Sequence, residues 1–418
     1  MTYYAAYIVL VLISGMALMQ GVFAAVFARQ LYRPRPRNRM VMEPRVAVIL
    51  SVRGPDPFLD ANMAALLEQD YDNFHLFIIV DSPNDAAWPY VKRVKELAPS
   101  RVDTLVLENH LPTCSLKCSA LSEAIESLDA EYEVVAFLDG DAPPYRRWLR
   151  DLVEPLADPT VGVTTGNRWY TPKQIGWGSM VRYFWNAGAV VQVWLNGITW
   201  AGSMAMRRDV IQDIELIPAW RKAISVDATV VRQLRAKGLK TKFVPTVIMA
   251  NAEDITLKSF MPWVERQMIA AKSSGSGWPL ILFHAASIAY CIFAPLVLLA
   301  IGAVQGDLEV MQCAVGAIVA YWTGTSLSAI TIERAMKQVF QNNRAPREWI
   351  NWRAVAYFFP AIVLSHLVYF RTLWGASFRN RVSWRGVEYE IRGINDVRMI
   401  AYQPYELKGE PATTESII

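Results

Sequence analysis

The sequence contains little cysteine. Four cysteines occur among 418 residues, and only Cys114 and Cys118 lie close together. No second pair of cysteines and no histidine follows them closely, as a tetrahedral zinc site would require. We therefore expect reduced thiols in a cytosolic domain, with neither a disulfide framework nor a zinc site.

The chain also carries little net charge. Its 42 Lys and Arg residues exceed its 38 Asp and Glu residues by four. A nucleic-acid-binding protein normally has a denser basic face, so the composition argues against that class. The sequence has no internal repeat and no low-complexity tract, which argues against a repeat architecture.

Long apolar runs account for the hydrophobic content of 53%, which is above that of ordinary soluble proteins. Each run reaches about 20 residues, the length that crosses the hydrocarbon core of a bilayer. The predicted membrane segments are Tyr3–Ala28, Trp278–Val304, Val310–Ile332 and Val355–Trp374.

The first apolar run is an anchor rather than a signal peptide, because no basic residue precedes it and it lacks a small-residue cleavage site. The segment Arg33–Arg39 follows it directly and holds four arginines. The positive-inside rule then places residue 33 onward in the cytoplasm.

Residues 44–275 have ordinary charge density and no run of membrane length. Short β-branched runs alternate here with helical stretches, which predicts βαβ units around a parallel sheet. The predicted strands are Arg45–Val52, Phe74–Asp81, Val102–Glu108 and Glu133–Asp139. The predicted helices are Phe58–Glu68, Trp88–Leu97 and Cys118–Leu128.

Acidic residues follow two of these strands. Asp81 and Asp139 fall at strand carboxyl ends, where open parallel sheets bind ligands. Gly140 then separates Asp139 from Asp141, so two carboxylates lie close together. Such a pair is favourable around a divalent cation, because Mg²⁺ prefers one or two carboxylates together with phosphate oxygens. We predict Mg²⁺ or Mn²⁺ at Asp139 and Asp141, where it would neutralise a diphosphate leaving group; the alternative is a solvated turn.

The domain resembles the family 2 glycosyltransferases, particularly the membrane-anchored branch that includes ceramide glucosyltransferase. The resemblance covers residues 44–275 and a short motif at Val382–Ile391. It implies an α/β, GT-A type (Rossmann-like) cytoplasmic domain joined to transmembrane α-helices. It also implies a nucleotide-sugar donor, for which we expect a UDP-sugar.

The donor-binding residues follow from the same resemblance. Asp81 or Asp85 would contact the nucleotide base, and Lys117 would lie near the diphosphate. Asp139 would approach the ribose and phosphates, and Asp141 the metal.

The segment Trp200–Asp209 is similar to the lining of the sugar and acceptor pocket in that family. This similarity makes Trp200, Gly202 and Ser203 candidates for substrate binding.

Two positions depart from the family pattern. In that family a glutamate usually precedes the third aspartate of the pattern, which is Asp227 here, and Val226 takes the place of that glutamate. A later motif begins with Gln267, but alanines occupy positions 270 and 271, where Arg-Trp is usual. Arg266 or Lys272 would then supply the positive charge toward the diphosphate.

Asp227 is the predicted catalytic residue. Ser225 is a typical N-cap and Gly238 a typical terminator, so Asp227 falls in the first turn of a helix. The helix dipole favours an acid there whatever its role. The same dipole keeps the carboxylate ionised, ready to accept the proton of an acceptor hydroxyl. The resemblance favours this general-base role.

The membrane topology contains a conflict. Four full spans would place the C-terminal residues outside, yet arginines at 379, 381, 385 and 392 follow the last segment and indicate a cytoplasmic tail. The last segment also contains Pro360, His366 and Arg371. We therefore expect it to lie in the interface or to re-enter the membrane, which leaves three spans.

Four domains result: an anchor at 1–32, the cytoplasmic GT-A domain at 33–277, membrane segments at 278–374 and a cytoplasmic tail at 375–418. We predict a multi-pass protein of the cell (inner) membrane that transfers sugar to a lipid acceptor and binds no nucleic acid. The alternatives are a processive polysaccharide synthase and a catalytically inactive, nucleotide-binding scaffold.

Overall fold

The computed structural model describes residues 2–32, 43–273, 275, 277–345 and 352–405. The arginine-rich segment 33–39, residues 274 and 276, and the end of the tail lie outside the described residues.

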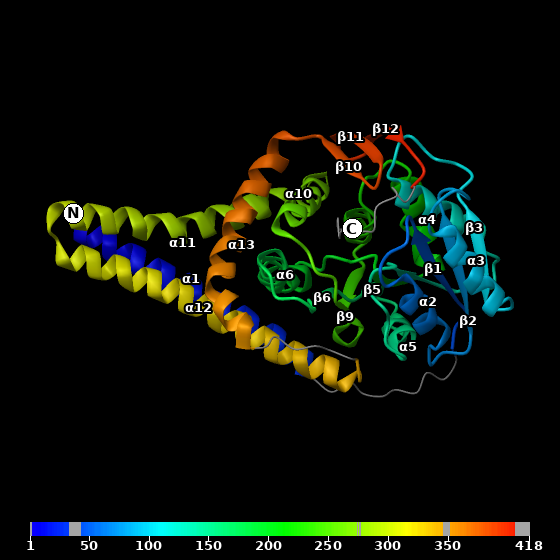
Figure 1. The fold of residues 1–418 in the computed structure, drawn as a ribbon, viewed down its shortest axis with the longest axis horizontal. Coiled ribbons are helices and arrows are strands. Elements are labelled where there is room, and N and C mark those ends of the chain that lie inside the picture. Colours follow the sequence, from blue (N-terminus) through cyan, green and yellow to red (C-terminus); the bar gives the residue numbers. More distant parts are fainter. Residues whose placement is uncertain (1, 33–42, 274, 276, 346–351, 406–418) are drawn as a thin grey trace.

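A seven-stranded sheet forms the centre of the globular part (Figure 1). Its strand order is β3-β2-β1-β4-β7-β5-β8. The strands are β1 Val46–Val52, β2 Phe74–Val80, β3 Val102–Val106, β4 Val134–Leu138, β5 Val161–Thr165, β7 Ser203–Arg207 and β8 Lys240–Phe243. The four predicted strands are β1 to β4, and they pair in parallel as expected. The whole sheet is mixed, because β7 runs antiparallel to β4 and β5.

Helices cover both faces of this sheet. The side chains of β1 alternate: Val46, Val48 and Leu50 face one helical layer, and Ala47 and Ile49 face the other. The first layer contains α2 Leu59–Leu67, α3 Trp88–Leu97 and α5 Trp148–Val153. The second contains α4 Leu116–Glu126, α7 Arg208–Asp213, α8 Leu216–Trp220 and α9 Val226–Ala236. Burial on both faces explains why β1 is apolar along its length.

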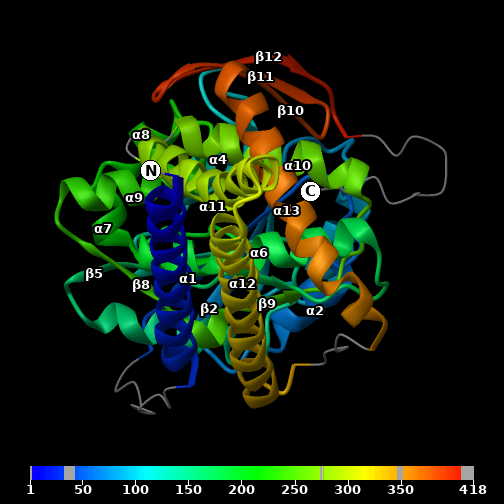
Figure 2. The same ribbon diagram turned by 90° about the vertical axis from the view of Figure 1, so that its left-hand side faces the viewer.

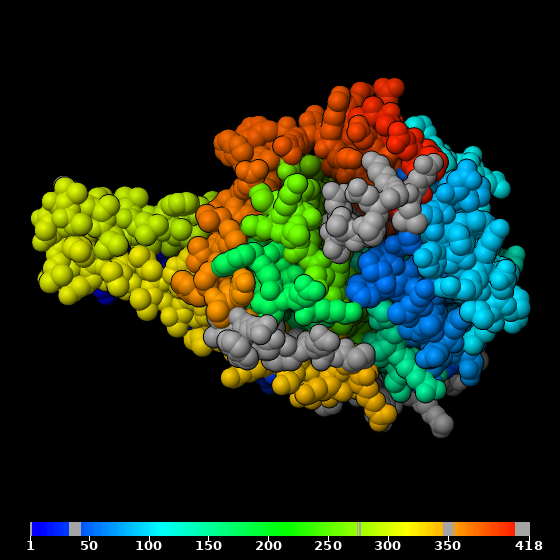
Figure 3. Space-filling model, viewed as in Figure 1, coloured from blue at the N-terminus to red at the C-terminus, as the bar shows by residue number. Residues whose placement is uncertain are grey.

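Three long apolar helices project from the globular part as a bundle (Figures 1 and 3). They are α1 Thr2–Tyr32, α11 Trp278–Gln305 and α12 Leu308–Asn342. Each is long and apolar enough to cross a membrane, and so is Ala356–Phe378 of the fourth long helix, α13 Trp352–Phe378. The four apolar helices support membrane association of the chain.

The helix α13 is arranged differently from the other three. It runs across the base of the bundle and packs mainly against α6 Trp177–Leu195 and α10 Leu257–Ser273 (Figures 1 and 2). The helices α6, α10 and α13 share one apolar cluster with the ends of α1 and α12. This cluster joins the bundle to the domain.

Two small sheets complete the fold. The strands β6 Arg168–Tyr170 and β9 Met249–Asn251 pair in parallel beside the central sheet. The predicted tail contains a three-stranded antiparallel sheet of β10 Arg381–Trp384, β11 Val387–Gly393 and β12 Asp396–Tyr402. Val387, Tyr389 and Val397 are buried in the core on the α4 and α9 side, so this sheet is part of the globular body.

Candidate active site

The acidic pair lies in the turn after β4. The side-chain amide of Asn62 donates to the carbonyl oxygens of Asp139 and Ala142, at 2.9 Å each, and so fixes the turn. A Cβ on Gly140 would lie 3.3 Å from a carboxylate oxygen of Asp56. A third acid, Asp56, therefore adjoins the pair, and no local sequence pattern predicts this contact.

Arg168 joins the two acids. Its Nη2 lies 3.1 Å from Asp139 Oδ2 and its Nη1 lies 2.9 Å from Asp141 Oδ2. Its guanidinium carbon lies 4.8 Å from the ring centroid of Trp200, a cation–π distance. Nothing in the local sequence of β6 distinguishes Arg168 from other arginines, so the sequence alone does not predict it as a site residue.

Lys117 forms an ion pair with Asp139 from the first turn of α4. Burial alone would raise the pKa of Asp139, but Lys117 and Arg168 hold it below its usual value. Burial would likewise lower the pKa of Lys117, and Asp139 raises it above normal. Both groups are therefore charged at neutral pH.

Asp141 fits a cation site. Its Oδ1 is buried and has no hydrogen-bond partner among the described residues. Burial raises its pKa, and the positive charge of Arg168 only partly offsets that effect. No cluster of three metal-binding side chains occurs in the described part of the chain. A cation here would rest on one or two carboxylates plus ligand oxygens, which is the usual coordination of Mg²⁺.

Asp227 lies in the first turn of α9, as predicted. The Ser225 hydroxyl caps the helix by accepting from the backbone N–H of Ala228. The Asp227 carboxylate accepts from the backbone N–H of Ala201. Burial raises its pKa to about 6, and Lys117 opposes that shift. Asp227, Lys117 and Asp139 thus interact in one site.

Asp81 and Asp85, the two candidates for contacting the nucleotide base, have different partners. Asp81 forms an ion pair with Arg53 and accepts from the Tyr402 hydroxyl at 2.8 Å. Its Oδ1 is buried without a partner among the described residues. Asp85 accepts from the backbone N–H groups of Gly54 and Ala87, at 2.9 and 2.7 Å, and therefore has a structural role in this turn.

Of the three substrate-binding candidates, Trp200 and Gly202 lie at the site and Ser203 does not. Trp200 stacks on Arg168 in the site. A Cβ on Gly202 would lie 2.2 Å from the Trp200 ring and 2.5 Å from Asp139 Oδ2, so only glycine fits there. Ser203 is fully buried; its hydroxyl accepts from Trp148 Nε1 at 2.9 Å and donates to a backbone carbonyl. The structure places Ser203 in the core, under the site.

The positions around the missing Arg-Trp pair lie in α10. Lys272 donates to the carbonyl oxygens of Ala376 and Ser377, at 3.1 and 2.8 Å, and so anchors the end of α13. Arg266 lies 5.8 Å from the ring centroid of Trp384 and has no carboxylate partner among the described residues. Burial and the nearby guanidinium groups of Arg385 and Arg168 lower its pKa to about 9. Gln267 is half-buried beside it.

The departure at Val226 concerns packing rather than the site. Its side chain is buried in the core between the sheet and α9. The other departures, Ala270 and Ala271, are half-buried in the last turns of α10.

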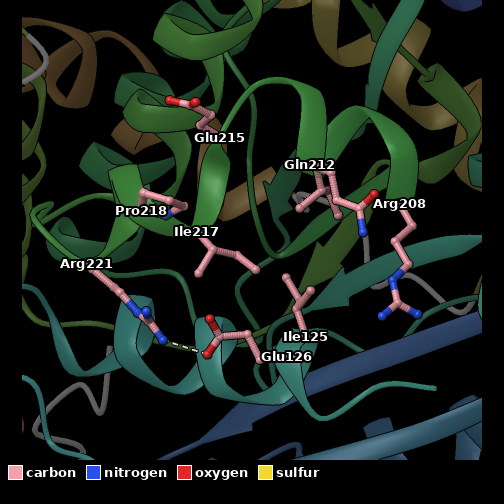
Figure 4. Close-up of a pocket in the computed structure, with 9 residues that line it drawn as sticks. Ile125, Glu126, Arg208, Gln212, Glu215, Ile217, Pro218 and Arg221 are labelled. Carbon is pink, nitrogen blue, oxygen red and sulfur yellow. Dashed lines mark hydrogen bonds and ion pairs between the residues drawn. The ribbon is translucent and has the colours of Figure 1, made fainter. Parts of the chain in front are cut away.

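A separate hollow lies away from these residues (Figure 4). It has a volume of about 380 Å³ and is formed by α4, α7, α8 and the residues next to them. Glu126 and Arg221 form an ion pair of 2.5 Å across it. It contains none of the predicted site residues.

The chain belongs to glycosyl transferase family 21, whose family model matches residues 9–396. This is the ceramide glucosyltransferase family, so the chain is a glycosyltransferase of the predicted branch with the predicted GT-A type α/β fold. A search of curated proteins found no match.

Three similar solved structures are also glycosyltransferases. One is the mannosyltransferase PcManGT from Pyrobaculum calidifontis in complex with GDP-Man and Mn²⁺, at 16% identity and a TM-score of 0.47, covering 88% of this chain and 99% of that one. Another is glucosyl-3-phosphoglycerate synthase from Mycobacterium tuberculosis with Mn²⁺ and UDP-glucose, at 14% identity and a TM-score of 0.38, covering 55% and 79%. The third is GalNAc-T7 with UDP, GalNAc and Mn²⁺, at 12% identity and a TM-score of 0.39, covering 56% and 52%.

Proposed function

We propose that the chain transfers a sugar from a UDP-sugar to a lipid hydroxyl at the cytoplasmic leaflet, with inversion at the anomeric carbon. The observation that carries the proposal is the convergence of Asp227, Lys117, Asp139 and Asp141. They come from three separate parts of the chain and interact in one site.

The nucleotide part of the donor binds an acidic side chain through its base and basic side chains through its diphosphate. Asp81 accepts a hydrogen bond from the base, because its Oδ1 is buried and lacks another partner. Lys117, Arg168 and Arg266 bind the diphosphate, since guanidinium and ammonium groups are the usual phosphate ligands. Gln267 is the next residue of α10 and is half-buried, and its side-chain amide also donates to the diphosphate.

Asp139 and Asp141 hold the divalent cation. The buried, unpartnered Oδ1 of Asp141 supports this assignment. A bound Mg²⁺ or Mn²⁺ would neutralise charge on the diphosphate. Arg168 bridges both acids and leaves them for the diphosphate when the donor binds.

Asp227 removes the proton from the acceptor hydroxyl as that oxygen attacks the anomeric carbon. A single displacement needs one base opposite the leaving group, and Asp227 is that base. Its raised pKa, about 6, still leaves the carboxylate mostly ionised at neutral pH. Trp200 and Gly202 border the sugar.

The acceptor is a lipid because the domain is joined directly to membrane helices. We place α1, α11 and α12 across the cell (inner) membrane and α13 along its cytoplasmic surface. Trp374 and Phe378, near the end of α13, are 72% and 69% exposed, as expected for side chains that meet lipid. The catalytic domain and the C-terminal sheet then share the cytoplasmic side.

Purified full-length protein should be incubated with radiolabelled nucleotide sugars and a membrane lipid extract. We expect one UDP-sugar to label the organic phase. Asp227→Asn should abolish that label while nucleotide binding, measured by calorimetry, persists. An inactive scaffold would bind nucleotide and label nothing, and this result would overturn the proposal.

A further inference from the structure

The turn between β10 and β11 contains an unusual residue. Trp384 pairs with Val387, so Arg385 and Gly386 alone form the turn. Their φ angles are +46° and +79°, both in the left-handed region. Two-residue turns of this kind favour Asn-Gly, because a long side chain at positive φ is strained. An arginine in this strained position suggests that its side chain has a function.

The Arg385 side chain reaches from this turn into the catalytic domain. Its Nη2 lies 2.5 Å from Asp56 Oδ1, and each side chain is only 9% exposed. Asp56 in turn adjoins Gly140 of the acidic pair. The turn is therefore bound directly beside the predicted metal site.

Arg385 also contacts the part of the site that we propose binds the nucleotide base of the donor. Its Nη1 donates to the carbonyl of Arg53, and Arg53 donates to the carbonyl of Arg385 at 2.9 and 2.8 Å. Arg53 forms the ion pair with Asp81. The turn thus lies between Asp81, which we propose binds the nucleotide base, and the residues that we propose bind the phosphates.

Three guanidinium groups gather here. Arg266 and Arg385 lie 5.8 and 5.7 Å from the ring centroid of Trp384, and Arg168 lies at the acidic pair. Asp56 pairs with Arg385 and the acidic pair with Arg168, so Arg266 alone of the three has no carboxylate partner among the described residues. A diphosphate would add negative charge beside all three groups, and its oxygens match the planar donors of arginine.

We propose that Arg385, presented by the β10–β11 turn beside Trp384, binds the donor diphosphate and replaces the arginine of the Arg-Trp pair, whose positions are occupied here by Ala270 and Ala271. This inference rests on the proposed function, since it assumes a nucleoside diphosphate donor. It assigns the C-terminal sheet to the donor site.

The test is calorimetric titration of the full-length protein with UDP and with uridine, in the presence of Mn²⁺. Arg385→Asn removes the guanidinium and retains a residue that suits the turn. We expect it to weaken UDP binding by about 10- to 100-fold, as for the loss of a charge-assisted hydrogen bond. Uridine binding should be unchanged. Arg381→Asn, whose side chain on β10 is 74% exposed, is the matched control and should bind UDP normally.

Each other outcome has a defined meaning. Equal weakening of UDP and uridine would show that Arg385 only holds the sheet in place and would overturn the inference. Unchanged UDP binding in Arg385→Asn would overturn it as well, while the proposed function stands. Wild-type protein that does not bind UDP would overturn both.

Discussion

Arg168 bridges the acidic pair. Two carboxylates separated by one residue repel each other, and the guanidinium between them offsets part of that repulsion. The same arrangement leaves Arg168 beside any phosphate that binds the pair. We therefore expect Arg168 to hold the site together without ligand and to bind the donor phosphates.

The pKa of Asp227 predicts the pH dependence of transfer. Burial raises this pKa to about 6, and only the ionised carboxylate can accept a proton. The transfer rate should therefore fall about tenfold per pH unit below about pH 6 and level off above it. A kcat profile from about pH 5 to about pH 8 measures this, and a flat profile would exclude Asp227 as the base.

Asp141 predicts a requirement for a divalent cation. Asp141→Asn removes a carboxylate from the proposed metal site and should lower turnover on the order of 10²-fold, as for other lost electrostatic contacts to a transition state. Mn²⁺ binding, followed by calorimetry, should weaken in the same variant. Full activity of the wild type in excess chelator would contradict the prediction.

Sequence separation explains which site residues could be predicted. Asp81, Asp139 and Asp141 follow strands of the parallel sheet, so a local pattern was sufficient to place them at the edge where such sheets bind ligands. Arg168 and Arg385 depend on partners 29 and 329 residues away. No local pattern encodes such contacts.

At the scale of elements, the start of β7 must approach the acidic turn closely. Gly202 lies beneath Trp200 and Asp139, and a methyl group there would overlap both. Gly202→Ala should lower the free energy of unfolding by about 1–3 kcal/mol, the usual cost of overpacking. It should also weaken nucleotide binding, because Asp139 must move.

Gly188→Ala is the control for this prediction. Gly188 lies in α6, and a Cβ there would meet nothing within 4 Å. Thermal unfolding and calorimetry compare the two variants. Nucleotide affinity unchanged in Gly202→Ala would contradict the close approach of β7 to the site.

The elements differ in how well the sequence predicted them. Strands β1 to β4 and helices α2 to α4 follow the predicted ranges closely, because apolar runs and turn residues mark them. The sheet of β10 to β12 was treated as a tail. Its strands alternate exposed and buried residues and bury only a few side chains against a distant part of the chain, so they lack a strong apolar signal.

At the scale of the whole molecule, the arrangement of α13 predicts three membrane spans. This helix crosses the base of the bundle, so the chain after it should remain on the side of the catalytic domain. Single cysteines at Gln305, at Lys92 and at Ile400 would report this, after the native cysteines are replaced by alanine. All three positions are exposed.

In sealed inside-out vesicles, an impermeant maleimide should label Lys92→Cys and Ile400→Cys and should leave Gln305→Cys unlabelled. If Lys92→Cys is labelled and Ile400→Cys is not, then α13 spans the membrane. The cytoplasmic position of the C-terminal sheet would then be wrong.

The number of helices in the bundle also leads us to predict a product with one added sugar. A processive synthase threads its polymer through a membrane channel, which usually needs more helices than the three of this bundle. The helix α10 ends at Ser273 and α11 begins at Trp278, and this closeness in sequence supports our expectation that the site lies near the bilayer surface. A lipid head group that arrives laterally, receives one sugar and leaves fits this arrangement.

Mass spectrometry of the lipid product tests this account most directly. Full-length protein in lipid vesicles should be supplied with the UDP-sugar that labels the organic phase. The molecular masses of the extracted lipids should then be measured before and after the reaction. We predict a single hexose-sized increment that depends on Asp227. A ladder of increments, or sugar that stays wholly in the aqueous phase, would contradict transfer of one sugar to a membrane lipid.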